Sequence, residues 1–123
     1  MTRARSALLV LLLSGPAARA GAADDCLSYE PAVVEVTGKL VRESEDTVAL
    51  LPDHPLCLNA TPGNGLNQGL TGVIRIQVVL DDGSLPPEKL FGARVTAHGR
   101  MFGAHGASRD TIVLIADRVH RAP

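Results

Sequence analysis

Alternation of apolar and polar residues predicts β-strands along most of the chain beyond residue 30. From Ala32 to Arg42, Val34, Val36 and Leu40 alternate with charged and hydroxyl residues, which is the period of two typical of a half-buried strand. Gly38 lies inside this run, and a glycine there is what a strand of a small, tightly coiled barrel needs to turn a corner.

Three further runs have the same strand character. They are Val73 to Leu80, Arg94 to Phe102 and Thr111 to Val119, the last of which differs in containing the continuous apolar run Ile112 to Ala116. A shorter β-prone run covers Thr47 to Leu51, and Pro55 to Leu58 is a candidate extension of it past Pro52. Within the first of the long runs, Ile74, Ile76, Val78 and Leu80 are predicted to share one face.

Turn-forming residues separate these strands. Asn59 to Gly69 is a polar loop with three glycines, and Asp81 to Ser84 has the composition of a turn. Pro86 to Phe91 is long enough for one or two helical turns and begins with proline, which is favoured at helix starts. We therefore predict an all-β domain, an OB-like five-stranded barrel with one short helix between strands 3 and 4. A different small β-sandwich or barrel is the alternative.

The first 22 residues have the pattern of a secretory signal peptide. Arg3 and Arg5 precede the apolar run Ala7 to Leu13, and two Ala-x-Ala cleavage candidates end at Ala20 and Ala22. The apolar run is shorter than the roughly 20 residues that a membrane span requires. We expect cleavage there, no membrane span, a single domain over residues 23–123, and a periplasmic or secreted location.

Charge narrows the choice of partners. The leader holds 3 of the 12 Lys and Arg residues and no acidic residue, which leaves 9 basic against 13 acidic residues in the mature chain. A nucleic-acid partner is not expected, because binding to a phosphate backbone depends on clustered Lys and Arg, and a single-strand groove also needs stacking aromatic residues. The expected partner is instead another periplasmic protein or a component of the cell envelope.

Cys26 and Cys57 are the chain's two cysteines. Export into an oxidising compartment favours a disulfide between them. Closing a loop of about 30 residues would stabilise the fold by roughly 3 to 4 kcal/mol. A metal-binding pair or a catalytic thiol is disfavoured, since there is no Cys-x-x-Cys motif.

Several segments resemble a family of short exported bacterial domains of unknown function. The similarity covers nearly the whole mature chain and rests on four stretches: Cys26 to Pro31, Val36 to Leu40, Pro55 to Leu58 and Val95 to His105, the last containing Gly-x-x-Phe-Gly-Ala-His. A looser similarity of pattern is to periplasmic bacterial OB-fold proteins linked to stress responses. The resemblance implies an exported location and no assigned activity, and it matches positions Cys26, Cys57 and His105.

Histidines are the candidate metal ligands. His98 and His105 flank the Gly-x-x-Phe-Gly turn, and His54 or His120 are possible third ligands, because imidazole suits zinc, copper or nickel. The family carries further histidines after the position of His105, whereas this chain has Gly106 to Arg109, which weakens a metal site. Histidines that are exposed or hydrogen-bonded for structural reasons are the favoured interpretation, and no cofactor is predicted.

Other polar clusters have simpler explanations than catalysis. Ser108 and Asp110 beside His105 contain the residue types of a hydrolase triad, but three residues on one glycine-rich loop rarely reach the required geometry. Asp81 and Asp82 resemble an acid–base pair, although their place before Gly83 favours a turn. The glycines of the polar loop precede a strand and not a helix, which argues against a phosphate-binding loop.

These observations favour a non-enzymatic exported binding or interaction module. The candidate contact segments are two loops, Asn59 to Gly69 and Gly103 to Ser108, since function concentrates on loops that a rigid scaffold holds. A histidine-based metal-binding periplasmic protein is the alternative, and a small hydrolase is a weaker one. The sequence leaves the oligomeric state open.

Overall fold

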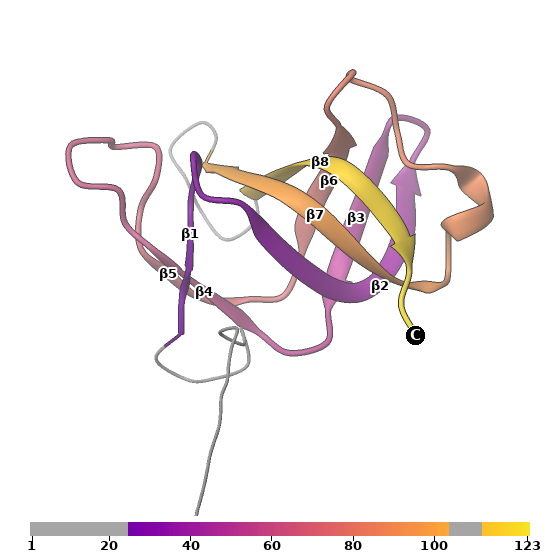
Figure 1. The fold of residues 1–123 in the computed structure, drawn as a ribbon, viewed down its shortest axis with the longest axis horizontal. Coiled ribbons are helices and arrows are strands. Elements are labelled where there is room, and N and C mark those ends of the chain that lie inside the picture. The colour runs from indigo at the N-terminus through magenta and orange to yellow at the C-terminus, as the bar shows by residue number, and fades with distance from the viewer. Residues whose placement is uncertain (1–24, 104–111) are drawn as a thin grey trace, which may run out of the picture.

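Five strands close into a barrel in the computed structural model, which describes residues 25–103 and 112–123. The barrel strands are β2 (Val34–Ser44), β3 (Thr47–Pro52), β6 (Ile76–Leu80), β7 (Arg94–Gly103) and β8 (Ile112–Arg121). Their spatial order is β2-β3-β6-β8-β7, and β7 pairs again with β2 to complete the circle (Figure 1). All neighbours are antiparallel except β6 and β8, which are parallel.

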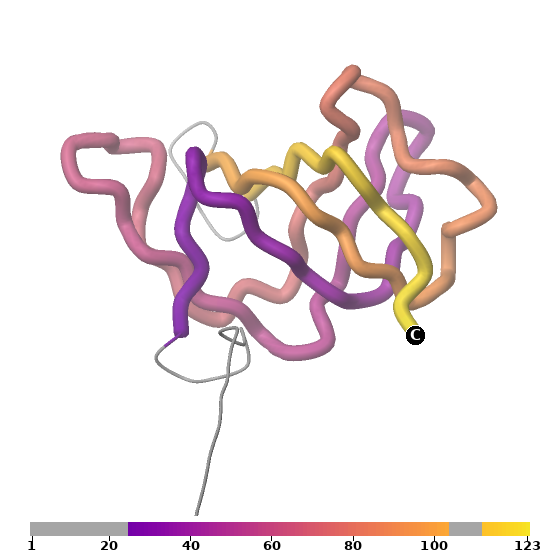
Figure 2. Tube along the Cα trace, viewed as in Figure 1, coloured from indigo at the N-terminus to yellow at the C-terminus, as the bar shows by residue number. Residues whose placement is uncertain are grey.

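Three short strands form a second sheet at one end of the barrel. They are β1 (Leu27–Ser28), β4 (Leu56–Asn59) and β5 (Leu70–Val73), in the order β1-β4-β5. In Figure 2 the tube between β4 and β5 projects from the end of the molecule that lies opposite the segment joining β6 to β7. The chain therefore makes eight described strands, of which five build the barrel.

The barrel core follows from the alternation in the sequence. In β2 every second residue from Val34 to Leu40 is buried, because successive side chains of a strand point to opposite faces. The largest fully buried side chains include Leu50, Ile76 and Met101. The apolar residues of the small sheet belong to the same cluster, so one core holds both sheets together.

Gly38 does not break β2 but marks where the strand changes neighbours. Residues up to Lys39 pair with β7, and residues from Gly38 onward pair with β3. A Cβ built on Gly38 would lie 2.1 Å from the carbonyl oxygen of Leu51. Glycine is required here because the backbone of β3 approaches so closely.

Two predictions about elements were wrong. The run Val73 to Leu80 is not one strand, because β5 ends at Val73, β6 begins at Ile76, and Ile74 is 66% exposed between them. Residues 56–59 do not extend β3, since they pair with β1 and β5 in the small sheet. The chain has to cross from that sheet to the barrel at Ile74 and Arg75, and this crossing interrupts the strand.

The predicted helix lies where it was expected but is shorter than the predicted segment Pro86 to Phe91. Between β6 and β7, the third and fourth strands of the barrel, the chain forms only a 3-10 helix, η2 (Glu88–Leu90), preceded by Pro87. It buries Leu90 against the core. The described residues contain no α-helix, and no helix among them is long and apolar enough to span a membrane.

Candidate functional site

A disulfide joins Cys26 to Cys57, with a Cα–Cα distance of 4.8 Å. It lies next to the parallel pairing of Leu27 with Leu58, so it fastens the beginning of the described chain to β4. This is the bridge expected from the two cysteines, and it serves the small sheet. The predicted leader, residues 1–22, lies outside the described residues.

The polar loop from Asn59 to Gly69 is organised by its own hydrogen bonds. The backbone N–H of Thr61 donates to the carbonyl of Asn67 at 2.9 Å, and the N–H of Asn64 donates to the carbonyl of Thr61 at 3.0 Å. The Asn64 side chain accepts a bond from the N–H of Leu66 at 2.9 Å, which is an Asx turn. The asparagines of this loop thus take part in a defined set of turns.

Asn67 connects this loop to the end of β7. Its side chain is 3% exposed, its Nδ2 donates to Thr61 Oγ1 at 3.1 Å, and its Oδ1 accepts the N–H of Gly103 at 3.3 Å. A Cβ on Gly103 would lie 1.9 Å from the carbonyl oxygen of Leu66. The structure therefore brings the first candidate loop against the first residue of the second.

Tyr29 also stabilises the junction between this loop and the end of β7. Its ring is buried, and its hydroxyl donates to the carbonyl of Gln68 at 2.6 Å. Burial raises the pKa of this hydroxyl, so it stays protonated and remains a donor. The N–H of the next residue, Glu30, donates to the carbonyl of Met101 in β7 at 2.9 Å.

Leu66 is the apolar side chain that this junction presents to solvent. It is 48% exposed, although its backbone is fixed between the Asx turn and Gly103. Sequence reasoning selected the loop but not Asn67 or Leu66 within it. Nothing in the sequence separates Asn67 from Asn59 and Asn64, because only the fold shows which asparagine is buried.

The second candidate loop lies mostly outside the described residues. Gly103 is its only described member, and His105, Ser108 and Asp110 are not described. The candidate triad and the candidate metal ligand His105 therefore remain sequence predictions.

The described histidines His54, His98 and His120 do not gather into a metal-binding group. His98 on β7 has its Nδ1 2.7 Å from Asp117 Oδ1 on β8, and because the carboxylate accepts, this nitrogen carries the hydrogen. The bond from His98 lowers the pKa of Asp117. His54 follows β3, and His120 pairs with Thr96 near the end of β8. Within the described ranges, no group of three His, Cys, Asp or Glu side chains is arranged to hold a metal ion.

Asp82 makes the side-chain hydrogen bonds of the turn that follows β6. Asp82 Oδ1 accepts bonds from Ser84 Oγ at 2.6 Å and from the Ser84 N–H at 2.9 Å, and these bonds lower its pKa. Gly83 adopts a φ of 90°, a conformation that favours glycine. The turn interpretation is thus confirmed for both aspartates, because Asp81 and Asp82 lie in the turn that the N–H of Gly83 closes by donating to the carbonyl of Leu80 at 2.8 Å.

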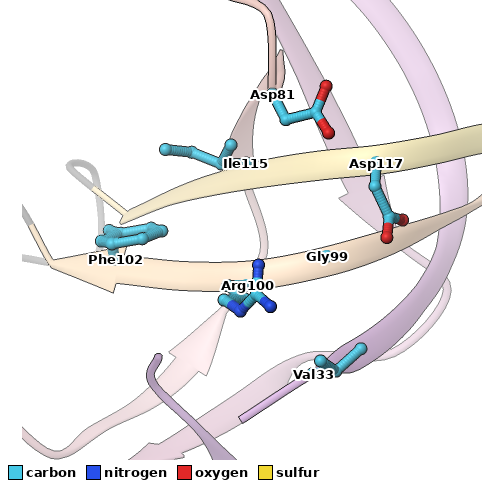
Figure 3. Close-up of a pocket in the computed structure, with 7 residues that line it drawn as sticks. All are labelled: Val33, Asp81, Gly99, Arg100, Phe102, Ile115 and Asp117. Atoms are coloured by element: carbon cyan, nitrogen blue, oxygen red, sulfur yellow. The ribbon is translucent and has the colours of Figure 1, made fainter. Parts of the chain in front are cut away.

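Asp81 borders a hollow on the outer face of β6, β8 and β7. The hollow has a volume of about 70 Å³ and is lined by Val33, Asp81, Gly99, Arg100, Phe102, Ile115 and Asp117 (Figure 3). Val33 is 52% exposed and Ile115 is 36% exposed. This mixture of apolar and charged side chains was not predicted, and its one sequence signal is Gly99 in the middle of a strand, which is typical of a bulge.

A bulge shapes this hollow. His98 pairs with Arg118 and Gly99 pairs with Ala116, so Asp117 is an extra residue of β8 without a partner in β7. Bulges redirect side chains and occur next to binding sites. Here the bulge turns Asp117 toward His98, and the backbone of β8 at Ile115 and Ala116 occupies the space that a side chain on Gly99 would need.

Comparison with known proteins adds no relative. No protein-family model, no curated protein and no solved structure matches the chain. The class of protein is therefore described from the structure alone, as a small five-stranded β-barrel with one disulfide.

Proposed function

We propose that this chain is an exported, non-enzymatic binding module whose contact surface is the loop Asn59–Gly69, held against the end of β7. We further propose that the barrel is of the OB type. In chain order its strands have the arrangement 1-2-3-5-4, with strands 3 and 5 parallel and a short helical turn between strands 3 and 4. OB barrels bind ligands on the face of strands 2 and 3 and through the loops that join strands 1 to 2 and 4 to 5. The Asn59–Gly69 loop lies between strands 2 and 3 and contacts Gly103, the last residue of strand 4.

The proposal rests on Leu66, whose backbone is held in place by the loop although its side chain is exposed. Its backbone N–H donates to Asn64 Oδ1, and its carbonyl packs against Gly103, to which the next residue, Asn67, is hydrogen-bonded. About half of the residue nevertheless faces solvent. A loop that is ordered before binding loses less conformational entropy when a partner binds. An apolar side chain kept exposed on such a loop is suited to contact with another macromolecule.

Export is supported by two features. The basic and apolar pattern of residues 1–22 is that of a leader, and disulfides persist in oxidising compartments. The partner is then another periplasmic protein or an envelope component, which meets the domain outside the cytoplasm.

Site-specific crosslinking tests the proposal. A photoreactive amino acid replaces Leu66 in one variant and Leu51, an exposed leucine on β3, in a matched control. After irradiation of intact cells, Leu66 is expected to capture a distinct partner that Leu51 does not. Equal capture, or none from Leu66, would refute the proposed contact surface.

A second variant distinguishes loss of the ordered loop from loss of the barrel fold. Asn67→Ala leaves Leu66 in place but removes the bonds to Thr61 and Gly103. Capture through position 66 is expected to fall in this background, while circular dichroism shows that the barrel persists.

A further inference from the structure

Three charged residues line the hollow between β6, β8 and β7: Asp81, Arg100 and Asp117. Asp117 is paired with His98 of the same chain, and the other two, which have opposite charges, lie on either side of an exposed apolar side chain. Ile115 lies on the central strand β8, Arg100 lies on β7 directly beside it, and Asp81 follows the end of β6 on the other side (Figure 3). Val33 and Phe102 complete the apolar rim.

Neither Arg100 nor Asp81 is paired with another charge within the described part of the molecule. The side chains of Arg100 and Asp81 form no hydrogen bond or ion pair with another described residue. They stand on strands separated by β8, and strands two apart in a sheet lie about 10 Å from each other. Each charge is therefore available to a partner that covers Ile115.

The arrangement is complementary to itself. A two-fold axis running parallel to β8 above Ile115 would lay the β7 side of one copy over the β6 side of the other. Arg100 of each copy then faces the end of β6 that carries Asp81 in the second copy, and the two Ile115 side chains meet at the axis. Pairing of residue i with residue j in both directions is the property of a two-fold interface.

We propose that the chain forms a two-fold homodimer through this hollow, with Arg100 of each copy pairing with Asp81 of the other. Strand addition is a poorer route, because β5, an edge of the small sheet, carries a register shift and Gly72 with a φ of 67°. Bulges of this kind protect sheet edges from pairing. A dimer formed through side chains also leaves the Asn59–Gly69 loop as a separate surface.

A charge-exchange experiment tests the dimer. Arg100→Asp gives a chain with acidic residues on both sides of Ile115, at positions 100 and 81. Asp81→Arg gives a chain with basic residues at both positions. Sedimentation equilibrium at low salt is expected to show that each single variant dimerises about tenfold more weakly than the wild type, since two exposed ion pairs are lost. An equimolar mixture of the two variants is expected to restore dimerisation, because both contacts become complementary again. The double variant R100D/D81R is expected to dimerise as the wild type does.

Two controls make the result specific. Lys39→Asp changes the net charge as Arg100→Asp does, at an exposed position of β2 outside the hollow, and it is expected to leave dimerisation unchanged. Ile115→Asp is expected to abolish dimerisation, with circular dichroism showing that the barrel remains folded.

The outcomes separate this inference from the proposed function. A wild-type protein that stays monomeric at every concentration, or single variants that dimerise as well as the wild type, would overturn the dimer. A hollow occupied by a different protein would appear as a monomer in pure solution and as a crosslinked partner at position 115 in cells. Capture through Leu66 tests the loop surface independently of all these results.

Discussion

Gly99 allows the backbone of β8 to approach β7 more closely than any residue with a side chain would. A Cβ built there would lie 2.1 Å from the carbonyl oxygen of Ile115 and 2.7 Å from the Cα of Ala116. Both atoms belong to the backbone of β8, which cannot move without disturbing the bulge at Asp117. The bulge and the hollow beside it therefore depend on the absence of a side chain at this position.

Replacing Gly99 with alanine is expected to destabilise the protein by about 3 kcal/mol, at the upper end of the usual cost of overpacking. Urea unfolding measures the loss. Gly65→Ala is the matched control, because a Cβ there meets nothing within 4 Å, and its effect is expected to stay within about 0.5 kcal/mol. Equal stability of the two variants would mean that β8 gives way at the bulge.

Asn67 has a comparable role in the loop. Asn67→Ala leaves the N–H of Gly103 and the hydroxyl of Thr61 without this partner, which is expected to cost about 1 to 3 kcal/mol. The measurement is urea unfolding, combined with hydrogen exchange of the Gly103 amide, which should become faster. Asn59→Ala serves as the control, because its amide makes only one exposed bond of 3.4 Å. An unchanged Gly103 amide would show that Asn67 does not hold the loop.

At the scale of elements, one ion pair fastens the crossing between the two sheets. Arg75, between β5 and β6, donates from Nε to Glu43 Oε2 on β2 at 2.7 Å. The hydrogen bond from Arg75 lowers the pKa of Glu43 below its ordinary value of 4.5. A carboxyl group with a lowered pKa in the folded state stabilises that state above about pH 4.5, and this contribution is lost as the pH falls through the lowered pKa.

Unfolding free energy is therefore expected to decline as the pH falls below about 4.5, and Glu43→Gln should make this decline less steep. The effect will be small, because the pair is partly exposed and screened by salt. Urea unfolding between pH 3 and 7, at low and high salt, measures it. Glu35→Gln removes an equal charge from an exposed position of β2, and an equal change in slope from that control would show that the Arg75 contact is not responsible.

Local patterns were sufficient for the barrel strands other than β6. Alternation placed β2 and β7, and the turn at Asp82 followed from its composition. Alternation failed at Ile74, because the sequence does not show that the chain leaves one sheet and enters another there. The same reason explains residues 56–59, whose partners β1 and β5 are distant in sequence.

The candidate site was predicted only in outline. The loop Asn59–Gly69 was selected from its composition, but the burial of Asn67 and the contact with Gly103 depend on β7, 36 residues away. The hollow at Ile115 was missed, because its charged residues come from different parts of the chain and are placed around Ile115 only through the pairing of β8 with β6 and β7. Long-range register, which short patterns do not encode, decides both features.

At the scale of the whole molecule, the small sheet and the barrel share one core. Tyr29, Leu56 and Val73 from the small-sheet region belong to the same buried cluster as Leu40 and Leu114 from the barrel. A single core favours a single cooperative transition. The disulfide closes the small sheet, so its stabilisation should reach the barrel as well.

Reduction of the disulfide is thus expected to lower the free energy of unfolding of the whole protein by roughly 3 to 4 kcal/mol. Tyr29 is the only tyrosine, and the chain has no tryptophan, so intrinsic fluorescence reports on the junction of the small sheet. Far-UV circular dichroism reports mainly on the barrel strands. The two signals should give one coincident urea transition both before and after reduction, with the midpoint shifted to lower urea. Separate transitions in the reduced protein, with fluorescence changing first, would instead show that the small sheet unfolds alone and that the bridge stabilises only that end of the molecule.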